Sequence, residues 1–272
     1  MSAAVDRPPE TTAGRAGRWL LTAIAACGFI YLFLPIAVIV GYSFNAPRGK
    51  FNVIWQGFTL DNWRDPLAAG PLTDAMVLSI QIAAIAAGAA TVLGSLIALA
   101  LVRYRFKGGG VVGLLLVLPL TAPEIVLGSS LATLFIDRGV QRGFWTIVIA
   151  HVMFCTSFVA LTVKARIRGF DWSLEDAAMD LGAPPWRTFS RVTLPLITPG
   201  ILAAALLSFA LSIDDFIITF FNAGSEETFP LRIFGASRVE ISPQINVLAT
   251  MVLVASIAIL LASVAFGRRR EA

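Results

Sequence analysis

The sequence predicts an all-α polytopic membrane protein with six transmembrane helices and both termini in the cytoplasm. Of its 272 residues, 57% are hydrophobic and only 14% are charged, whereas about a quarter of the residues in soluble domains are charged. Six apolar runs reach the length of about 20 residues that a helix needs to cross a bilayer. Lys and Arg are distributed unevenly between the two sides of these runs. These observations exclude a soluble globular protein and a disordered chain.

Each of the six runs is apolar over most of its length. The runs are residues 19–42, 73–102, 111–135, 143–163, 199–221 and 246–266. The third run is interrupted by Pro119, Pro123 and Glu124, and the fifth carries Asp214 and Asp215. The first run is too long for a cleaved signal peptide and no A-x-A-like site closes it, so we expect it to remain as a membrane anchor.

The basic residues set the orientation of the chain. With the N-terminus inside, fourteen Lys and Arg residues lie on the inner side and seven on the outer side. Inner loops are the ones enriched in these residues. We therefore expect a membrane domain at 19–266, between cytoplasmic tails at 1–18 and 267–272. The net charge of +4 does not indicate nucleic-acid binding, because the basic residues form short clusters between the runs.

The inner loop at 164–198 carries the most informative pattern. Ser173 is a candidate N-cap, and Glu175 and Asp176 follow in the first turn, where acids favour a helix. Gly182 is a candidate helix stop. A second short helix is expected at about 186–191. The loop is thus predicted to place two short helices on the cytoplasmic face, and the alternative is an ordinary interfacial connection.

The spacing in this loop resembles a known pattern. An acid-Ala-Ala triplet at 176–178 is followed after three residues by a glycine, and after nine more by V-T-L-P. This resembles the E-A-A loop of ATP-binding-cassette importer permeases, which implies a type I permease fold and docking of the loop on an ATPase subunit. Asp176 replaces the usual Glu and Val192 the usual Ile, and we expect coupling to be retained. The coupling residues that the resemblance implies are Asp176, Ala177, Ala178, Gly182, Leu194 and Pro195.

The resemblance extends over nearly the whole chain. The matching stretches are 42–45, 55–59, 122–126, 143–145 with His151, 212–216, 230–233 and 242–246. They are similar to the second permease of bacterial spermidine/putrescine importers. This implies a location in the bacterial inner membrane, a related permease as heterodimer partner, two ATPase subunits and an extracytoplasmic polyamine-binding protein, with lipid around the spans and no nucleic acid.

No catalytic site or cofactor is expected in this chain. It has no G-x-x-x-x-G-K-[ST] run, so ATP and Mg²⁺ would be held by the partner ATPase subunits. A single histidine, His151, makes a metal site improbable. Two alternatives stay open: an importer of this class for another small solute, and a proton-coupled secondary transporter or channel that uses Glu124 and Asp215 as a relay.

Three carboxylates fall inside apolar runs. Glu124 lies about 20 Å and Asp214 about 22 Å from the cytoplasmic ends of their helices. An ionisable group at such depth usually marks a pathway or a paired site. On a continuous helix, Asp215 would share one polar stripe with other residues, and Asp214 would lie about 100° away. The other members of the stripe are Ser208, Ser212, Thr219 and Asn222.

The stripe favours Asp215 as the carboxylate that lines the translocation path. Asp214 would meet the partner subunit or cap a local distortion, and both would reach substrate if the helix unwinds here. Aromatic walls for a methylene chain are expected at Phe216, Phe220, Trp145 and Tyr42, with packing or an interfacial belt as the alternative. The alternative for the acids is a structural ion pair or a protonated carboxyl. The predicted path residues are Asp215, Glu124, Asp214, Ser212, Thr219, Phe216, Trp145 and Tyr42.

Overall fold

A computed structural model describes residues 12–67, 70–104, 106–239 and 241–268. The described chain is helical, with two isolated bridges, Asn45 with Phe58 and Phe51 with Ile241, as its only extended pairing. It forms two compact units, unit 1 from Met1–Ala69 with Ser237–Ala272 and unit 2 from Gly70–Ala236. The all-α prediction is confirmed. The predicted tails lie mostly outside the described residues.

Unit 1 contains α1 (Thr12–Tyr42), α2 (Asp61–Arg64) and α12 (Pro243–Arg268), in which α1 and α12 are in contact. The segment after α1 is folded around two buried asparagines. Asn45 Nδ2 donates to Asn52 Oδ1 at 2.6 Å, and Asn52 Nδ2 donates to the carbonyl of Tyr42 at 2.9 Å. These bonds satisfy buried polar groups that the turn would otherwise leave without partners.

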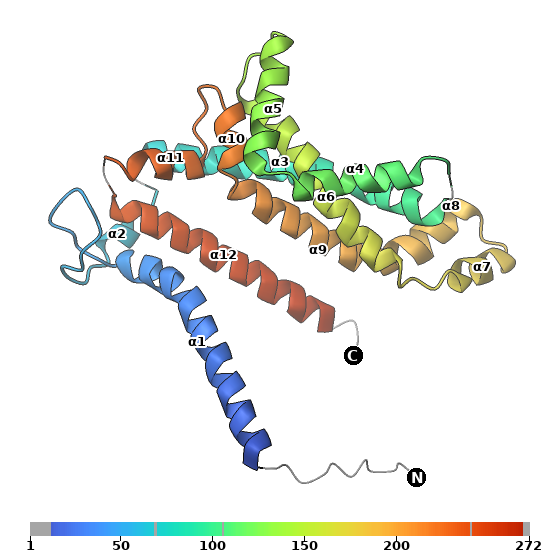
Figure 1. Ribbon diagram of the computed structural model, residues 1–272, viewed down its shortest axis with the longest axis horizontal. Helices are drawn as coiled ribbons and strands as arrows, with labels where there is room; N and C mark the ends of the chain where they lie inside the picture. The colour runs from blue at the N-terminus through green and yellow to red at the C-terminus, as the bar shows by residue number, and fades with distance from the viewer. Residues whose placement is uncertain (1–11, 68–69, 105, 240, 269–272) are drawn as a thin grey trace. The chain divides into compact units, whose positions relative to one another are not determined.

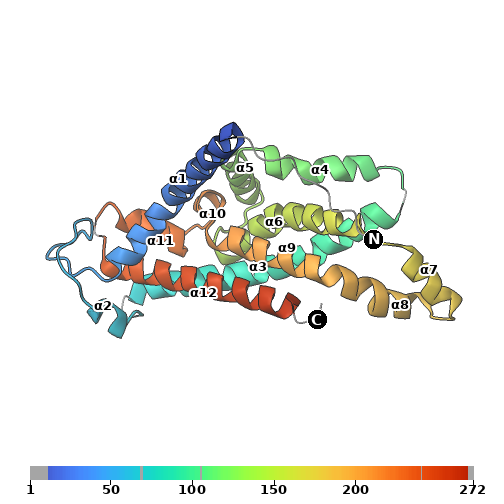
Figure 2. The ribbon, with the colours of Figure 1, turned by 90° about the horizontal axis from the view of Figure 1, so that it is seen from below.

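The core of unit 2 is formed by α3 (Gly70–Arg103), α6 (Phe144–Ile167) and α9 (Leu194–Ile213), which run side by side (Figures 1 and 2). Small residues allow the close approach. A Cβ added at Gly94 of α3 would lie 2.7 Å from the Cβ of Val159 in α6. The fully buried small residues of this core include Ala83, Ala86, Ala90, Ala98, Ala150 and Cys155.

The third apolar run is two helices with a sharp corner between them. α4 (Gly109–Thr121) and α5 (Glu124–Asp137) meet at 108°, and Figure 1 shows α5 turning away from α4. Ala122 is extended, with φ −73° and ψ 140°. This is the conformation that a following proline favours. The interruption predicted at Pro123 is therefore a bend.

The fifth run differs from the prediction at both ends. α8 (Pro185–Thr188), the π-helix η1 (Phe189–Thr193) and α9 form one helical stretch, Pro185–Ile213. The separate short helix expected at about 186–191 is therefore wrong, because these residues begin the span itself. The wider π turn precedes Pro195, which has no N–H and needs room beside the carbonyl four residues earlier.

The fifth run, 199–221, is not one continuous helix, and of the alternatives left open the structure shows the one in which Asp214 caps a local distortion. The helix ends at Ile213 and resumes as α10 (Ile217–Asn222), followed by α11 (Phe229–Ala236). Within the described residues, α1, α3, α6 and Pro185–Ile213 are each long and apolar enough to cross a membrane, and the bent pair of α4 and α5 makes a fifth candidate. The described apolar part of α12 is shorter.

Candidate functional site

The break between α9 and α10 is made by two adjacent aspartates. Asp214 is the C-cap of α9, with φ −98° and ψ −2°. Asp215 Oδ2 accepts hydrogen bonds from the backbone N–H and the hydroxyl of Thr219, both at 2.8 Å. A carboxylate in this position satisfies free N–H groups of the next helix and favours its start. The sequence therefore stops one helix and starts another without a proline or glycine.

Asp215 belongs to a buried network centred on His151 of α6. His151 Nε2 lies 3.2 Å from Asp215 Oδ2 and 2.9 Å from Thr219 Oγ1, and Nδ1 lies 2.7 Å from Ser212 Oγ. All four side chains are buried, Asp215 with 9% of its surface exposed. Because the Thr219 hydroxyl donates to Asp215, Nε2 is the donor toward both oxygens. These hydrogen bonds attach the chain segment between α9 and α10 to α6.

The predicted polar stripe therefore points into this subunit. Its five members are all buried, namely Ser208, Ser212, Asp215, Thr219 and Asn222. The predicted stripe requires one continuous helix, but α9 ends at Ile213 and α10 begins at Ile217, between Ser212 and Thr219. Asn222 extends the fastening to α5, because its Nδ2 donates to the carbonyl of Gly128 at 3.2 Å.

Asp214 and Glu124 are the exposed carboxylates at the two breaks. Asp214 is exposed where α9 ends, and Glu124 is exposed as the first residue of α5. The two helices that follow the breaks, α5 and α10, pack closely against each other, since a Cβ added at Gly128 would lie 3.1 Å from Ile218 Cα. Both helix breaks thus contribute an exposed acid to one region of unit 2.

Aromatic rings lie next to Asp214 in the chain and pack on one another. The Phe216 ring centroid is 5.9 Å from that of Phe220 and 4.9 Å from that of Phe234. Phe220 keeps 56% of its surface exposed. Such rings offer faces to methylene groups and cations. Trp145 packs edge-on against Phe144 at the start of α6.

Tyr42 belongs to unit 1, where local contacts use both its ring and its hydroxyl. The hydroxyl donates to the carbonyl of Val53 at 3.0 Å, and the ring packs edge-on against Trp55. That Tyr42 lines the translocation path stays a prediction.

The loop at 164–198 forms one short helix, α7 (Ser173–Asp180), before the long helical stretch. Asp171 caps it, accepting the Ser173 N–H at 3.0 Å. Ser173 is therefore the first helical residue, and its prediction as N-cap is wrong. Hydrogen bonds from the Ser173 side chain and backbone hold the pKa of Asp171 below its ordinary value. The stop predicted at Gly182 is confirmed, with φ +85° and the Ala183 N–H bonded to the carbonyl of Ala178.

Glu175 is the buried residue of α7, with 3% of its surface exposed. Its carboxylate forms a two-point ion pair with Arg103, at 2.8 Å and 3.0 Å, and accepts a hydrogen bond from the hydroxyl of Thr193. The sequence predicts for Glu175 only a place in the first turn of a helix. No local signal points to its partners, since Arg103 lies 72 residues away in the chain.

The rest of α7 and the following turn are open. Asp176 and Ala177 are exposed, while Leu181 keeps 90% and Trp186 75% of their surfaces exposed. Ala178 is half-buried, and Leu194 and Pro195 are exposed at the start of α9. Large apolar side chains exposed beside an acid are typical of a protein interface.

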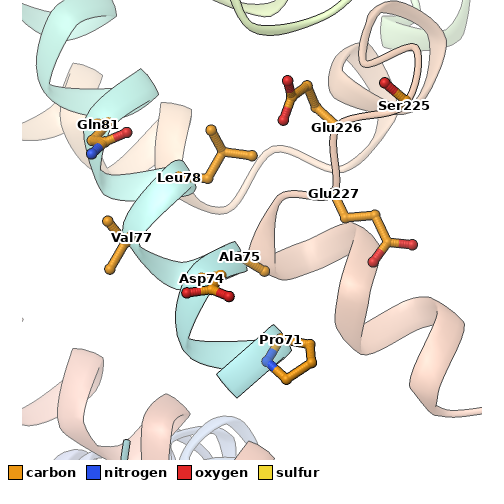
Figure 3. A pocket seen from close by; sticks show the side chains of 9 residues that line it. All are labelled: Pro71, Asp74, Ala75, Val77, Leu78, Gln81, Ser225, Glu226 and Glu227. Atoms are coloured by element: carbon orange, nitrogen blue, oxygen red, sulfur yellow. The ribbon is translucent and has the colours of Figure 1, made fainter. Parts of the chain in front are cut away.

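A pocket of about 540 Å³ lies at the start of α3. Figure 3 shows Asp74 on α3 and, across the pocket, Glu226 and Glu227 on the segment after α10. Glu227 is paired with Arg232 at 2.7 Å. These residues were not predicted as functional. Among the described residues, no group of three His, Cys, Asp or Glu residues could hold a metal ion.

Residues 90–270 match the family described as binding-protein-dependent transport system inner membrane component. This match covers both helix breaks and the loop at 164–198. The chain belongs to this family. It is therefore a permease of the inner membrane, as the sequence predicted.

Curated relatives cover most of this permease. It is 39% identical over 253 residues to the spermidine/putrescine transport system permease protein PotC of Escherichia coli K12, covering 93% of this chain and 95% of PotC. It is 40% identical over 238 residues to the putrescine transport system permease protein PotI of the same organism, covering 85% and 84%. The resemblance on which the sequence analysis relied is thus confirmed.

Solved structures share the fold at low identity. A bacterial ABC transporter involved in the import of the acidic polysaccharide alginate matches with TM-score 0.69 and 15% identity, over 97% of this chain and 99% of that one. An amino acid ABC transporter crystallised with histidines matches with TM-score 0.59 and 18% identity, over 78% and 100%. The permease fold is therefore common to importers of different cargo, and the cargo depends on side chains.

Proposed function

We propose that this permease is one of two membrane subunits of an ATP-driven importer for polyamines. The single observation that carries the cargo assignment is the pair of exposed carboxylates, Asp214 and Glu124, presented at two helix breaks beside phenylalanine rings. The spermidine and putrescine systems named for PotC and PotI support the same cargo. An anion is disfavoured, because the six apolar runs contain no Lys or Arg.

The chain crosses the membrane six times in this proposal. The spans are α1, α3, the bent pair α4 and α5, α6, the stretch Pro185–Ile213 with α10, and α12. The excess of Lys and Arg on one side supports a cytoplasmic location for both termini and α7. The pocket bounded by Asp74 and Glu226 then lies on the outer side, where cargo arrives.

A polyamine is a chain of methylenes punctuated by ammonium groups. Asp214 and Glu124 would each contact an ammonium group, and Phe216 and Phe220 would contact the methylenes between them. One such charge pair at 4 Å is worth about 4 kcal/mol near a protein surface before desolvation. Asp215, which the sequence favoured as the path residue, instead shapes the break through His151 in this proposal.

ATP is used by partners. The exposed surface formed by Asp176, Ala177, Leu181 and Trp186 would contact one of two ATPase subunits, which hold ATP and Mg²⁺. A related permease completes the path, and an external polyamine-binding protein delivers the cargo. Closure of the ATPase pair would move α7 and switch the path from outward- to inward-facing.

Uptake by the reconstituted complex tests this function. Proteoliposomes that contain both permeases, the ATPase subunits and the binding protein should accumulate labelled spermidine or putrescine only with ATP. Unlabelled polyamines should compete, while histidine and alginate oligosaccharides should not. Uptake that persists without ATPase subunits and collapses with the proton gradient would contradict the proposal, as would competition by an unrelated solute alone.

A further inference from the structure

The base of α7 is joined to the membrane helices at one buried carboxylate. We propose that Glu175 is the joint through which movement of α7 reaches α3 and α9, so that it positions the coupling loop without contacting cargo or ATP. This inference rests on the proposed function, because it assumes that an ATPase subunit moves α7.

Three chain segments converge on Glu175. Arg103 is the last residue of α3, Glu175 lies in the first turn of α7, and Thr193 is the last residue of the π-helix. Arg103 approaches both carboxylate oxygens, and the Thr193 hydroxyl donates to Oε1. Oε1 thus accepts from donors of two other segments, and Oε2 accepts from Arg103.

The joint is built to be stiff. A two-point guanidinium–carboxylate pair fixes orientation as well as distance. Thr193 is fully buried, and the Arg103 guanidinium lies 5.7 Å from the ring centre of Trp172. Trp172 in turn packs on Phe170 at 4.8 Å, and both rings contact the core of unit 2. Removing Arg103 would leave the buried carboxylate of Glu175 without its charged partner.

The joint also lies at the start of a lever. α9 begins at Leu194, directly after Thr193, and ends at Ile213 beside the exposed Asp214. Its 20 residues span about 30 Å. A displacement of α7 that moves Thr193 therefore moves the cytoplasmic end of the helix that carries Asp214. Arg103 transmits the same displacement to α3, which packs along α9.

The rest of α7 offers little other attachment. Its remaining side chains are exposed or half-buried, including the neighbouring Asp176. Asp176 is thus exposed where a partner subunit can contact it, while Glu175 is buried and attaches α7 to the ends of α3 and η1.

The test measures coupling in the assembled complex with Glu175→Gln, Thr193→Val and Arg103→Gln. Asp180→Asn is the matched control, since Asp180 is an exposed acid of the same helix. We expect polyamine taken up per ATP hydrolysed to fall about tenfold in Glu175→Gln, within the range of allosteric couplings. ATPase subunits should still co-purify, and Asp180→Asn should match the wild type. The double variant Glu175→Gln with Arg103→Gln should be no worse than either single variant, because the two residues act as a pair.

Two results would contradict the proposal that Glu175 transmits the movement of α7 to α3 and α9. One is an unchanged ratio of uptake to hydrolysis in Glu175→Gln and Thr193→Val. The other is a parallel loss of uptake, hydrolysis and subunit association, which would give Glu175 a merely structural role. Thr193→Val removes one hydroxyl, so it keeps the test open if Glu175→Gln does not assemble. Failure of the proposed function is distinguishable, because the wild-type complex itself would then show no ATP-driven polyamine uptake.

Discussion

Two regions of this permease, α7 in the loop at 164–198 and the break between α9 and α10, each present a pair of adjacent acids. In both pairs one carboxylate is buried and the other is exposed. Glu175 is held by Arg103 and Thr193, and Asp215 by His151 and Thr219. Their neighbours, Asp176 and Asp214, are exposed.

The two regions differ in the base that they use. Arg103 is partly exposed and approaches both oxygens of Glu175, whereas His151 is buried together with Asp215 and contacts one of its oxygens at 3.2 Å. Glu175 therefore makes a fixed ion pair between segments, while Asp215 is fastened chiefly by hydrogen bonds. In both regions the buried acid has internal donors, which leaves the exposed acid available to something outside the subunit.

The largest expected effect separates the two aspartates by stability. Asp215→Ala removes the cap of α10 and the partner of His151, so we expect the free energy of unfolding to fall by about 3 kcal/mol. Asp214→Ala should change it by less than about 0.5 kcal/mol, as for other exposed positions. Unfolding in mixed detergent–SDS micelles measures both. A larger loss for Asp214→Ala would reverse the assignment.

Transport should depend on the exposed acid Asp214, whose loss has little effect on stability, and on Glu124. Asp214→Asn and Glu124→Gln each remove one contact to an ammonium group, and a net loss of about 2 kcal/mol corresponds to a roughly thirtyfold rise in KM for spermidine. Asp137→Asn, an exposed acid at the other end of α5, is the control and should leave KM unchanged. Initial rates of uptake across a spermidine titration give these values. Unchanged KM in Asp214→Asn would remove it from the path.

The sequence predicted more of the fold than of the site. Length and hydrophobicity identify every long helix, and Gly182 correctly marks the end of α7. Pro123 marks the bend in the third run, but its angle depends on packing against α6 and α10. The break at Asp214 has no proline or glycine to announce it. It forms because Asp215 finds donors on Thr219 and His151 that only the folded chain brings together.

Residues that act across long separations were the ones missed. His151 is the only His, Asp, Glu, Lys or Arg in the run 143–163, and this was a signal that a polar partner faces it from another helix. Glu175 gave no such signal, because an acid in a first helical turn is already explained by the helix dipole. Its burial follows from the position of Arg103 at the end of α3.

Association with the ATPase should distinguish the two acids of α7. We expect Asp176→Asn to weaken co-purification of the ATPase subunits about tenfold, because it removes a charge from the exposed contact surface. Glu175→Gln should bind them as the wild type does. Titration of the purified ATPase subunit onto the permease pair in detergent measures the affinity. An equal loss of affinity for the ATPase subunits in both variants would contradict the separate roles of the exposed Asp176 and the buried Glu175.

The smallest expected effect is a dependence of stability on pH at the cap of α7. Hydrogen bonds from Ser173 lower the pKa of Asp171 in the folded chain. The ionised carboxylate of Asp171 therefore stabilises the folded state, and this stabilisation is complete above the unfolded pKa of about 4. The contribution is lost as the pH falls through the folded pKa. Thermal unfolding of the complex between pH 3 and pH 8 should show this loss in the wild type. Asp171→Asn should remove that component of the pH profile, and a profile identical to the wild type would exclude the cap.

Accessibility of positions 214 and 215 tests the division of the acids most directly. Cys27 and Cys155 are first replaced by alanine, and Asp214→Cys and Asp215→Cys are then introduced singly into the assembled complex. A cationic thiol reagent should modify the cysteine at 214 rapidly and that at 215 slowly, and spermidine-loaded binding protein should protect only position 214. Rapid, spermidine-protected modification at 215 with an inert position 214 would contradict the account.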